Sequence, residues 1–373
     1  MYKLSDYDYY LPRELIAQKK TNPPHESKML IYYRNSGKVE HKKFWNLKNI
    51  LDSNYLMFFN KTKVIKARLL WQIDGKQAEI FYLRDLQSWC FEALVRPWKK
   101  FKKGKIVEFK VDSKSLKFEV VDFTKDWRIL RFIEGNILDV LQRSGQMPLP
   151  PYITYNKSKE SSYQSILAKE VWSVAAPTAS LHFTPQLIDA LKRKWVEMEE
   201  VVLHVWLGTF KKVDVEDIRE YDIHTEQVKV NKSIFAKVAN AKLNSKKILA
   251  VGTTVVRALE SLPALWLILP QQIKESFSSN IKNFRKTKRW DKNIIYNFYV
   301  DWDSLIWETK LFIYPWFRFE IIDSLITNFH LPQSSLLMLV AAFMGYESMR
   351  QVYDVAIKRK YKFYSFGDGM FIL

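Results

Sequence analysis

The chain is almost free of cysteine, because Cys90 is the single one among 373 residues. One thiol cannot support a disulfide framework, and it excludes a zinc or iron–sulfur site built from cysteines. The opening stretch, MYKLSDYDYYLP, has no basic segment followed by an apolar one, so we expect no export signal. The apolar run SLLMLVAAFMG is too short to cross a bilayer. We therefore expect a cytoplasmic protein with no membrane partner.

Glycine is scarce and tryptophan is abundant, with 10 glycines and 13 tryptophans. Ordinary usage of about 7% would give about 26 glycines. Trp98 and Trp316 follow prolines in expected turns, and Trp195 lies where a helix should end in a left-handed cap, which favours glycine. We interpret the tryptophans as a reassigned stop codon that the organism reads as glycine. Thirteen independent replacements are the alternative, and each would put an indole where backbone freedom is needed. A chain with glycine at these positions should be more stable and more active.

Two kinds of binding motif are missing. No G-x-G-x-x-G follows an expected strand, so neither a dinucleotide-binding fold nor the common methyltransferase fold is indicated. No His-x-x-x-His pair or paired-carboxylate spacing suggests a metal centre, and we expect no metal. Four histidines together with Glu226 could still ligate zinc, which leaves a metal-dependent hydrolase as one alternative.

Positive charge is in excess, with 59 Lys and Arg against 40 Asp and Glu, a formal net charge of +19. Such a field attracts polyanions, above all nucleic acid. A lysine-rich proteome would give the same balance, so charge alone does not decide between the two. Lys61, Lys63 and Arg68 are our candidates for phosphate contacts.

The periodicity of the chain changes twice. Residues 69 to 133 contain short alternating runs such as AEIFYL and CFEALV, which indicate a small barrel or sandwich. From residue 163 onward, expected helices and strands alternate, as in a layered α/β fold. We predict an α/β main domain with a mixed sheet, formed by residues 1–68 and 150–373, into which a small β-barrel domain (69–149) is inserted. Residues 264–306 are expected to form a long loop insertion.

Four of the six histidines lie in segments that look functional. His182 ends SVAAPTASLHF, and His330 lies in LITNFHLPQSSLLMLVAAF, between an apolar strand and a capped apolar helix. His204 and His224 lie in VVLHVW and IHTE. A histidine at a strand end suits proton transfer near neutral pH. Any single one could equally be a structural histidine, but together they suggest one site built from distant segments.

The segment KILAVGTTVVRALES reads as a strand, a tight turn and a helix. Amides at the start of the helix, with Gly252, Thr253 and Thr254 in the turn and Arg257 one helical turn later, could bind an anion. An ordinary capped strand–helix turn explains the same residues.

Ten collinear segments carry a resemblance to a known family. They are LSDYDYYLPRELIA, FFNKTKVIKARL, GQMPLPPYI, YQSILAKEVWSVAAPTASLHF, VVLHVWLGTF, IHTE, ILAVGTTVVRALES, LFIYPWF, ITNFHLPQSSLLMLVAAF and YSFGDGMFI. Together they resemble the S-adenosylmethionine:tRNA ribosyltransferase-isomerase family of queuosine biosynthesis. The resemblance implies an α/β domain that carries a smaller β-barrel.

It also implies a transferase reaction. The ribosyl part of S-adenosylmethionine moves to 7-aminomethyl-7-deazaguanine in the anticodon region of tRNA, giving epoxyqueuosine, adenine and methionine. S-adenosylmethionine is then a substrate, no further cofactor is needed, and we expect a monomer. The acid–base candidates within the matching segments are His182, His204, His330, Glu226 and Asp368. The substrate-binding candidates there are Thr178, Phe183, Thr209, Phe210, Gly252, Thr253, Thr254, Arg257, Tyr314, Asn328 and Phe329. A non-catalytic RNA-binding protein is the remaining alternative.

Overall fold

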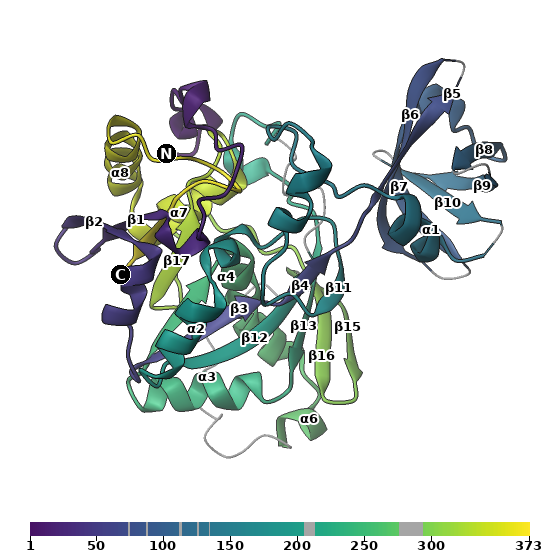
Figure 1. Cartoon of the computed structure of the whole chain (residues 1–373). Coiled ribbons are helices and arrows are strands. Elements are labelled where there is room, and N and C mark those ends of the chain that lie inside the picture. Colours follow the sequence, from purple (N-terminus) through teal and green to yellow (C-terminus); the bar gives the residue numbers. More distant parts are fainter. Residues whose placement is uncertain are drawn as a thin grey trace. The chain divides into compact units, whose positions relative to one another are not determined.

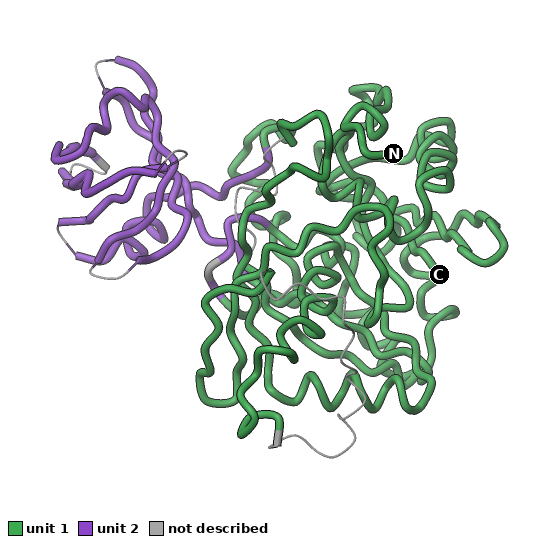
Figure 2. Tube along the Cα trace, turned by 180° about the vertical axis from the view of Figure 1, so that it is seen from behind, with its two compact units in different colours: residues 1–62, 151–170, 176–373 green, residues 63–150, 171–175 purple. Residues whose placement is uncertain are grey.

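The computed structural model describes residues 1–73, 75–86, 89–111, 114–124, 127–133, 135–204, 213–275 and 294–373. The chain forms two compact units (Figure 2). The main unit contains residues 1–62, 151–170 and 176–373, and the second unit contains residues 63–150 and 171–175.

A ten-stranded mixed sheet forms the centre of the main unit (Figure 1). Its strands, in order across the sheet, are β15 (Ile295–Asp301), β16 (Ser304–Thr309), β13 (Glu226–Asn231), β12 (Glu197–His204), β3 (Tyr55–Asn60), β14 (Lys247–Val251), β17 (Ser324–Asn328), β18 (Gly369–Ile372), β1 (Lys28–Tyr32) and β2 (Val39–Lys43). The four strands from β12 to β17 run parallel. Strand β3 is buried at every position, as expected for a parallel strand covered on both faces.

Strand β18 lies in this sheet between β1, from the first part of the chain, and β17, from its last part. It pairs antiparallel with β17 on one side and parallel with β1 on the other, where Met29 lies opposite Gly369. All four of its residues are buried.

Seven helices of the described residues belong to the main unit: α2 (Pro185–Lys192), α3 (Ile234–Leu243), α4 (Thr253–Glu260), α5 (Leu262–Ile268), α6 (Gln271–Glu275), α7 (Ser335–Met344) and α8 (Tyr346–Lys358). Short 3-10 segments are η1 (Leu4–Tyr7), η2 (Arg13–Leu15), η3 (Pro24–Glu26), η4 (Phe44–Asn49), η6 (Lys157–Lys159), η7 (Ser161–Tyr163), η8 (Thr178–His182) and η10 (Ile218–Glu220). Capping fixes where two helices begin, because the side chains of Thr184 and Ser334 accept N–H bonds in the first turns of α2 and α7. Leu187 and Leu191 of α2 pack with Phe44 of η4 and Met57 of β3 in one apolar cluster.

The second unit is built on a barrel-like antiparallel sheet of six strands. Their order is β5 (Arg68–Ile73), β6 (Lys76–Asp85), β7 (Cys90–Arg96), β10 (Arg128–Phe132), β9 (Lys114–Phe123) and β8 (Ile106–Val111), with α1 (Ile137–Ser144) and η5 (Trp98–Lys100) in the same unit. Phe91, Phe101, Phe109 and Phe118 are fully buried here. Strands β4 (Thr62–Val64) and β11 (Glu170–Ser173) form a separate two-stranded ribbon. The predicted combination of an α/β unit that contains a mixed sheet with a second, antiparallel β unit is confirmed.

The prediction of a loop insertion over residues 264–306 is wrong for its described parts. Helix α5 continues to Ile268, and α6 follows from Gln271. Residues 295–301 form strand β15, which pairs antiparallel with β16. The aromatic and β-branched sequence IYNFYVD favours a strand, and the polar residues before it concealed that signal. Residues 276–293 lie outside the described part of the chain.

Four tryptophans adopt the left-handed backbone that glycine prefers. They are Trp89 (φ 60°), Trp195 (φ 58°), Trp302 (φ 49°) and Trp316 (φ 82°). Their exposed fractions are 78%, 80%, 91% and 74%, so packing does not require an indole at any of these positions. Trp195 confirms the expected left-handed end of α2, since Val196 N–H bonds back to Leu191 O at 3.2 Å.

Trp307 and Trp206 differ from these four exposed tryptophans. Trp307 in β16 is completely buried, and its Nε1 donates to Ser261 Oγ at 3.2 Å. It behaves as a core residue, and the glycine interpretation does not suit it. Trp206 lies outside the described residues.

Candidate functional site

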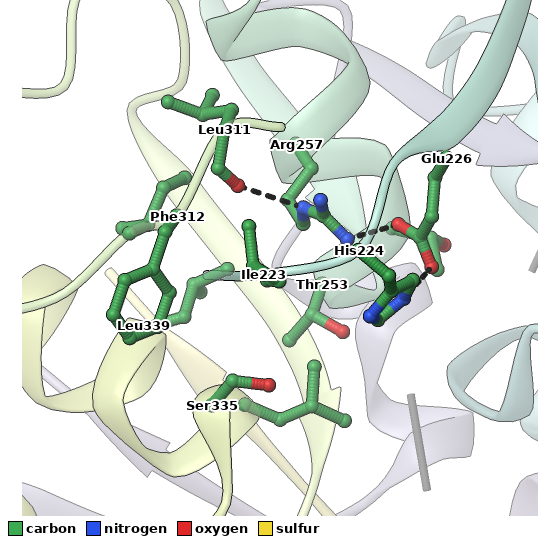
Figure 3. Close-up of a pocket in the computed structure, with 12 residues that line it drawn as sticks. Ile223, His224, Glu226, Thr253, Arg257, Leu311, Phe312, Ser335 and Leu339 are labelled. Atoms are coloured by element: carbon green, nitrogen blue, oxygen red, sulfur yellow. Dashed lines mark hydrogen bonds and ion pairs between the residues drawn. The ribbon is translucent and has the colours of Figure 1, made fainter. Parts of the chain in front are cut away.

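A small pocket in the main unit collects the start of α4, the residues before and within β13, the segment after β16, and the start of α7 (Figure 3). Its lining residues are Ile223, His224, Glu226, Thr253, Thr254, Arg257, Leu311, Phe312, Ile313, Ser335, Leu336 and Leu339. The cavity volume of about 20 Å³ is enough for one water. The pocket can therefore take the edge of a ligand rather than a whole nucleoside.

The tight turn after β14 places the start of α4 at this pocket. Gly252 has φ of +99°, a conformation that side chains disfavour, and its N–H bonds to Ile326 O at 2.8 Å. The residues that follow, Thr253 and Thr254, line the pocket. The positive end of the helix dipole therefore faces the cavity.

Arg257 and Glu226 form a buried ion pair in the pocket wall. Arg257 is 6% exposed and Glu226 is 1% exposed. Arg257 Nη1 donates to Glu226 Oε2, and its Nε donates to Leu311 O at 2.9 Å. Its Nη2 is buried and has no hydrogen-bond partner among the described residues. Because an unmade hydrogen bond of a buried charged group is costly, this atom is a natural contact for a ligand.

His224 stands next to the same carboxylate. Its Nε2 lies 3.5 Å from Glu226 Oε1, and its side chain is 17% exposed. Both ring nitrogens are buried and lack hydrogen-bond partners within the described ranges. Figure 3 shows the ring beside Glu226 and Thr253. Sequence reasoning placed His224 in a motif but not among the site residues, although its i, i+2 spacing from Glu226 was a usable signal for side chains on one side of an extended segment.

His182 and Asn328 bring the two histidine segments together. Asn328 Nδ2 donates to His182 Nε2 at 3.1 Å. The His182 ring stacks on Phe44 with centroids 3.8 Å apart. Burial lowers the pKa of His182 to about 3, so the ring is neutral at pH 7 and its Nε2 lone pair is already used.

His330 is equally enclosed. Its Nε2 lies 2.8 Å from Thr327 Oγ1, and its backbone N–H bonds to Tyr353 Oη at 3.0 Å. Burial lowers its pKa to about 3. At the end of β12, His204 Nδ1 lies 3.5 Å from Thr62 Oγ1, and burial lowers the His204 pKa to about 4.

Asp368 connects β1 to the turn before β18. Its Oδ1 accepts the Lys28 N–H and its Oδ2 accepts the Lys362 N–H, both at 2.8 Å. Burial raises the pKa of this carboxyl group, against the two backbone bonds that lower it. Both oxygens are thus engaged in holding backbone.

The aromatic and threonine candidates for substrate binding differ in how exposed their side chains are. Phe183 is 1% exposed and packs edge-on against Phe59, and Phe329 is completely buried among other aromatic rings. Tyr314 is half-buried beside Phe312, which lines the pocket, and Thr178 is half-buried at the start of η8. Thr209 and Phe210 lie outside the described residues.

Two of the three phosphate candidates are engaged with carboxylates. Lys61 Nζ lies 3.7 Å from Glu170 and 3.5 Å from Glu200, and Arg68 Nε lies 2.8 Å from Glu79. Lys63 is exposed. A second group of cations, which sequence reasoning did not single out, lies at the end of β7 and in the turn that leads to β8. We call Arg96, Lys99, Lys102 and Lys105, all exposed, the basic turn.

Within the described ranges, no three His, Cys, Asp or Glu side chains gather closely enough to hold a metal ion. The helices of the described residues are also all too short or too polar to cross a membrane.

Comparisons with known proteins agree with one another. A family model described as "Queuosine biosynthesis protein" matches residues 4–372. A protein from Carboxydothermus hydrogenoformans named S-adenosylmethionine:tRNA ribosyltransferase-isomerase is 41% identical over 373 residues, covering 100% of both chains. A protein of the same name from Fusobacterium nucleatum is 39% identical over 372 residues, covering 99% of this chain and 96% of its own.

The crystal structure of S-adenosylmethionine tRNA ribosyltransferase from Thermotoga maritima is similar, with a TM-score of 0.52 and 32% identity, covering 99% of this chain and all of that one. The fold and the site thus fit an α/β enzyme with an added β unit. The chain belongs to the queuosine biosynthesis protein family.

Proposed function

We propose that the protein is an S-adenosylmethionine:tRNA ribosyltransferase-isomerase. It moves the ribosyl part of S-adenosylmethionine onto 7-aminomethyl-7-deazaguanine in tRNA and isomerises it to epoxyqueuosine, releasing adenine and methionine. The similarity to proteins of this name over the whole chain carries the proposal. S-adenosylmethionine is a substrate here, and the reaction needs no resident metal or cofactor.

The pocket suits a step in which negative charge builds up on a leaving group. As the bond between ribose and adenine breaks, its electron pair goes to the base. The free Nη2 of Arg257 and the positive end of α4 both favour that charge. Glu226 holds Arg257 in place from the other side. We assign the adenine edge of the substrate to this pocket.

The other acid–base candidates have less freedom. His182, His330 and Asp368 are occupied by Asn328, Thr327 and two backbone amides. In this proposal they position the segments around the site rather than transfer protons. His204 remains a candidate, since its one close contact is at 3.5 Å.

The two domains in this proposal have the bounds that were expected from the sequence. We assign residues 69–149 to an inserted β-barrel domain and residues 1–68 and 150–373 to the main domain, acting as a monomer. The compact units, 63–150 with 171–175 and the remainder, support this assignment. The tRNA is recognised at its anticodon region, where the deazaguanine precursor lies.

The decisive test of function is product release. We expect the purified protein to release adenine and methionine from S-adenosylmethionine only when tRNA carrying the deazaguanine precursor is present, without added metal. Chromatography of the released base and mass analysis of digested tRNA measure both products. Unmodified tRNA and free S-adenosylmethionine are the controls. Binding of tRNA without adenine release would favour a non-catalytic RNA-binding protein, and loss of activity with a chelator that zinc restores would favour a metalloenzyme.

The basic turn offers a test of tRNA binding. Each phosphate contact adds about −0.9 to the slope of log affinity against log salt for duplex-like RNA. Replacing Lys99, Lys102 and Lys105 with Gln should weaken tRNA binding and flatten this slope by roughly 2 to 3. Filter binding between about 50 and 200 mM salt measures it.

The control changes charge equally on the main unit. Lys237, Lys242 and Lys246, each paired with a carboxylate, are replaced with Gln. This variant should bind tRNA almost as the parent does. An equal loss in both variants would mean that net charge, and not the basic turn, drives binding.

A further inference from the structure

The four motif histidines divide into two kinds. His182, His204 and His330 are not among the residues that line the pocket, and burial lowers the pKa of His182 and His330 to about 3 and that of His204 to about 4. They are neutral at pH 7 and have no proton to give. His224 lines the pocket, and among the described residues neither of its ring nitrogens has a hydrogen-bond partner. Of the four, it is the one that lines this pocket.

The surroundings of His224 favour an orientation in which it can donate. Nε2 lies 3.5 Å from Glu226 Oε1, so a small rotation of the ring would complete a hydrogen bond to the carboxylate. That bond would stabilise an imidazolium and leave Nδ1–H for the ligand. The positive charge of Arg257, which would oppose an imidazolium in this pocket, is paired with the second oxygen of Glu226. Glu226 thus lies beside both basic side chains of the pocket.

We propose that His224, oriented by Glu226, is the acid that protonates the departing adenine; this rests on the proposed function. The glycosidic C–N bond breaks and its electron pair goes to the base. The Nδ1–H bond of the imidazolium breaks, its proton bonds to an adenine nitrogen, and neutral adenine leaves. The imidazole recovers a proton from water for the next turnover. Arg257 Nη2 stabilises the charge on the base before the proton arrives.

The test compares leaving groups. His224→Gln should slow adenine release by about 10²- to 10⁴-fold, the usual effect of a missing general acid. An S-adenosylmethionine analogue carrying 2-fluoroadenine, a base that leaves more easily without protonation, should recover most of this loss. A merely structural role would slow both substrates equally. His224→Asn is a second variant, and calorimetric titration with S-adenosylmethionine shows whether each variant still binds substrate.

The control is His41→Gln. His41 lies on strand β2, and its Nδ1 is 2.8 Å from Tyr361 Oη. This variant should keep the parental rate with both substrates. Selective recovery with the fluorinated base in a His224 variant that binds substrate supports the inference. Near-parental rates, or equal slowing with both bases, overturn it. If the parental protein itself releases no adenine from precursor tRNA, the proposed function fails instead, so the two failures are distinguishable.

Discussion

Replacing Trp89, Trp195, Trp302 and Trp316 with glycine should stabilise the protein by about 4 kcal/mol. Each of these residues has a positive φ and is more than 70% exposed. A residue with a Cβ pays ~1 kcal/mol in the left-handed region, which glycine avoids, and exposed indoles offer little packing to lose. Sites that share no contacts add their effects. Urea unfolding of the parental and fourfold variants measures the difference.

The matched control is Trp307→Gly. This tryptophan is fully buried and hydrogen-bonded to Ser261. Losing it should cost ~3–5 kcal/mol, because a large cavity forms in the core. Equal or lower stability of the fourfold variant would contradict the glycine interpretation. The coding DNA at these positions is a separate test. The glycine interpretation expects one codon at the four exposed tryptophan positions and a different codon at position 307.

Acid should unfold the protein steeply below pH 6. Burial lowers the pKa of His182 and His330 to about 3 and of His204 to about 4 in the folded state, against an ordinary value of 6.5. Their stabilising contribution is complete above pH 6.5 and is lost as the pH falls toward these folded values, because the unfolded chain binds the protons first. Three such groups give a slope of ~4 kcal/mol per pH unit. Burial raises the pKa of Glu260 to about 7, which offsets about a third of this slope between pH 7 and pH 4.5 because the folded state then binds that proton first. A typical stability of ~5–15 kcal/mol would then be consumed within a few pH units.

Urea midpoints between pH 7 and pH 4.5 measure this slope. His330→Gln should remove about a third of it, provided that the variant still unfolds cooperatively. A stability that stays flat from pH 7 to pH 5 would show that these histidines are not held neutral by the fold.

The sequence predicted the architecture well because its signals are local. The alternating runs of residues 69–133 marked the antiparallel unit, and the alternation of expected helices and strands from residue 163 onward marked the layered α/β unit. The Gly252 turn was also visible, since a strand, a tight Gly-Thr-Thr turn and an apolar helix leave a clear pattern. Strand β15 was missed because polar neighbours concealed a short aromatic strand.

The site was less predictable, because partners come from distant parts of the chain. Glu200 reaches Lys61 only through the parallel pairing of β12 with β3, and no spacing in the sequence reveals it. Likewise, Asn328 and His182 are 146 residues apart. Phe183 and Phe329 match family segments, yet they pack inside. Motifs therefore identified the segments that meet, but not which side chain in each remains available.

The position of β18 has a consequence for biosynthesis. This strand lies between β1 and β17, so the N-terminal strand waits for almost the entire chain before its parallel partner exists. Until residues 369–372 have left the ribosome, β1 and β17 each present an unpaired apolar edge, which other chains can join. The edge of β1 thus lacks this partner while residues 33–368 are made, and the edge of β17 lacks it only while residues 329–368 are made. A product that stops before residue 369 leaves β1 and β17 without the strand that joins them.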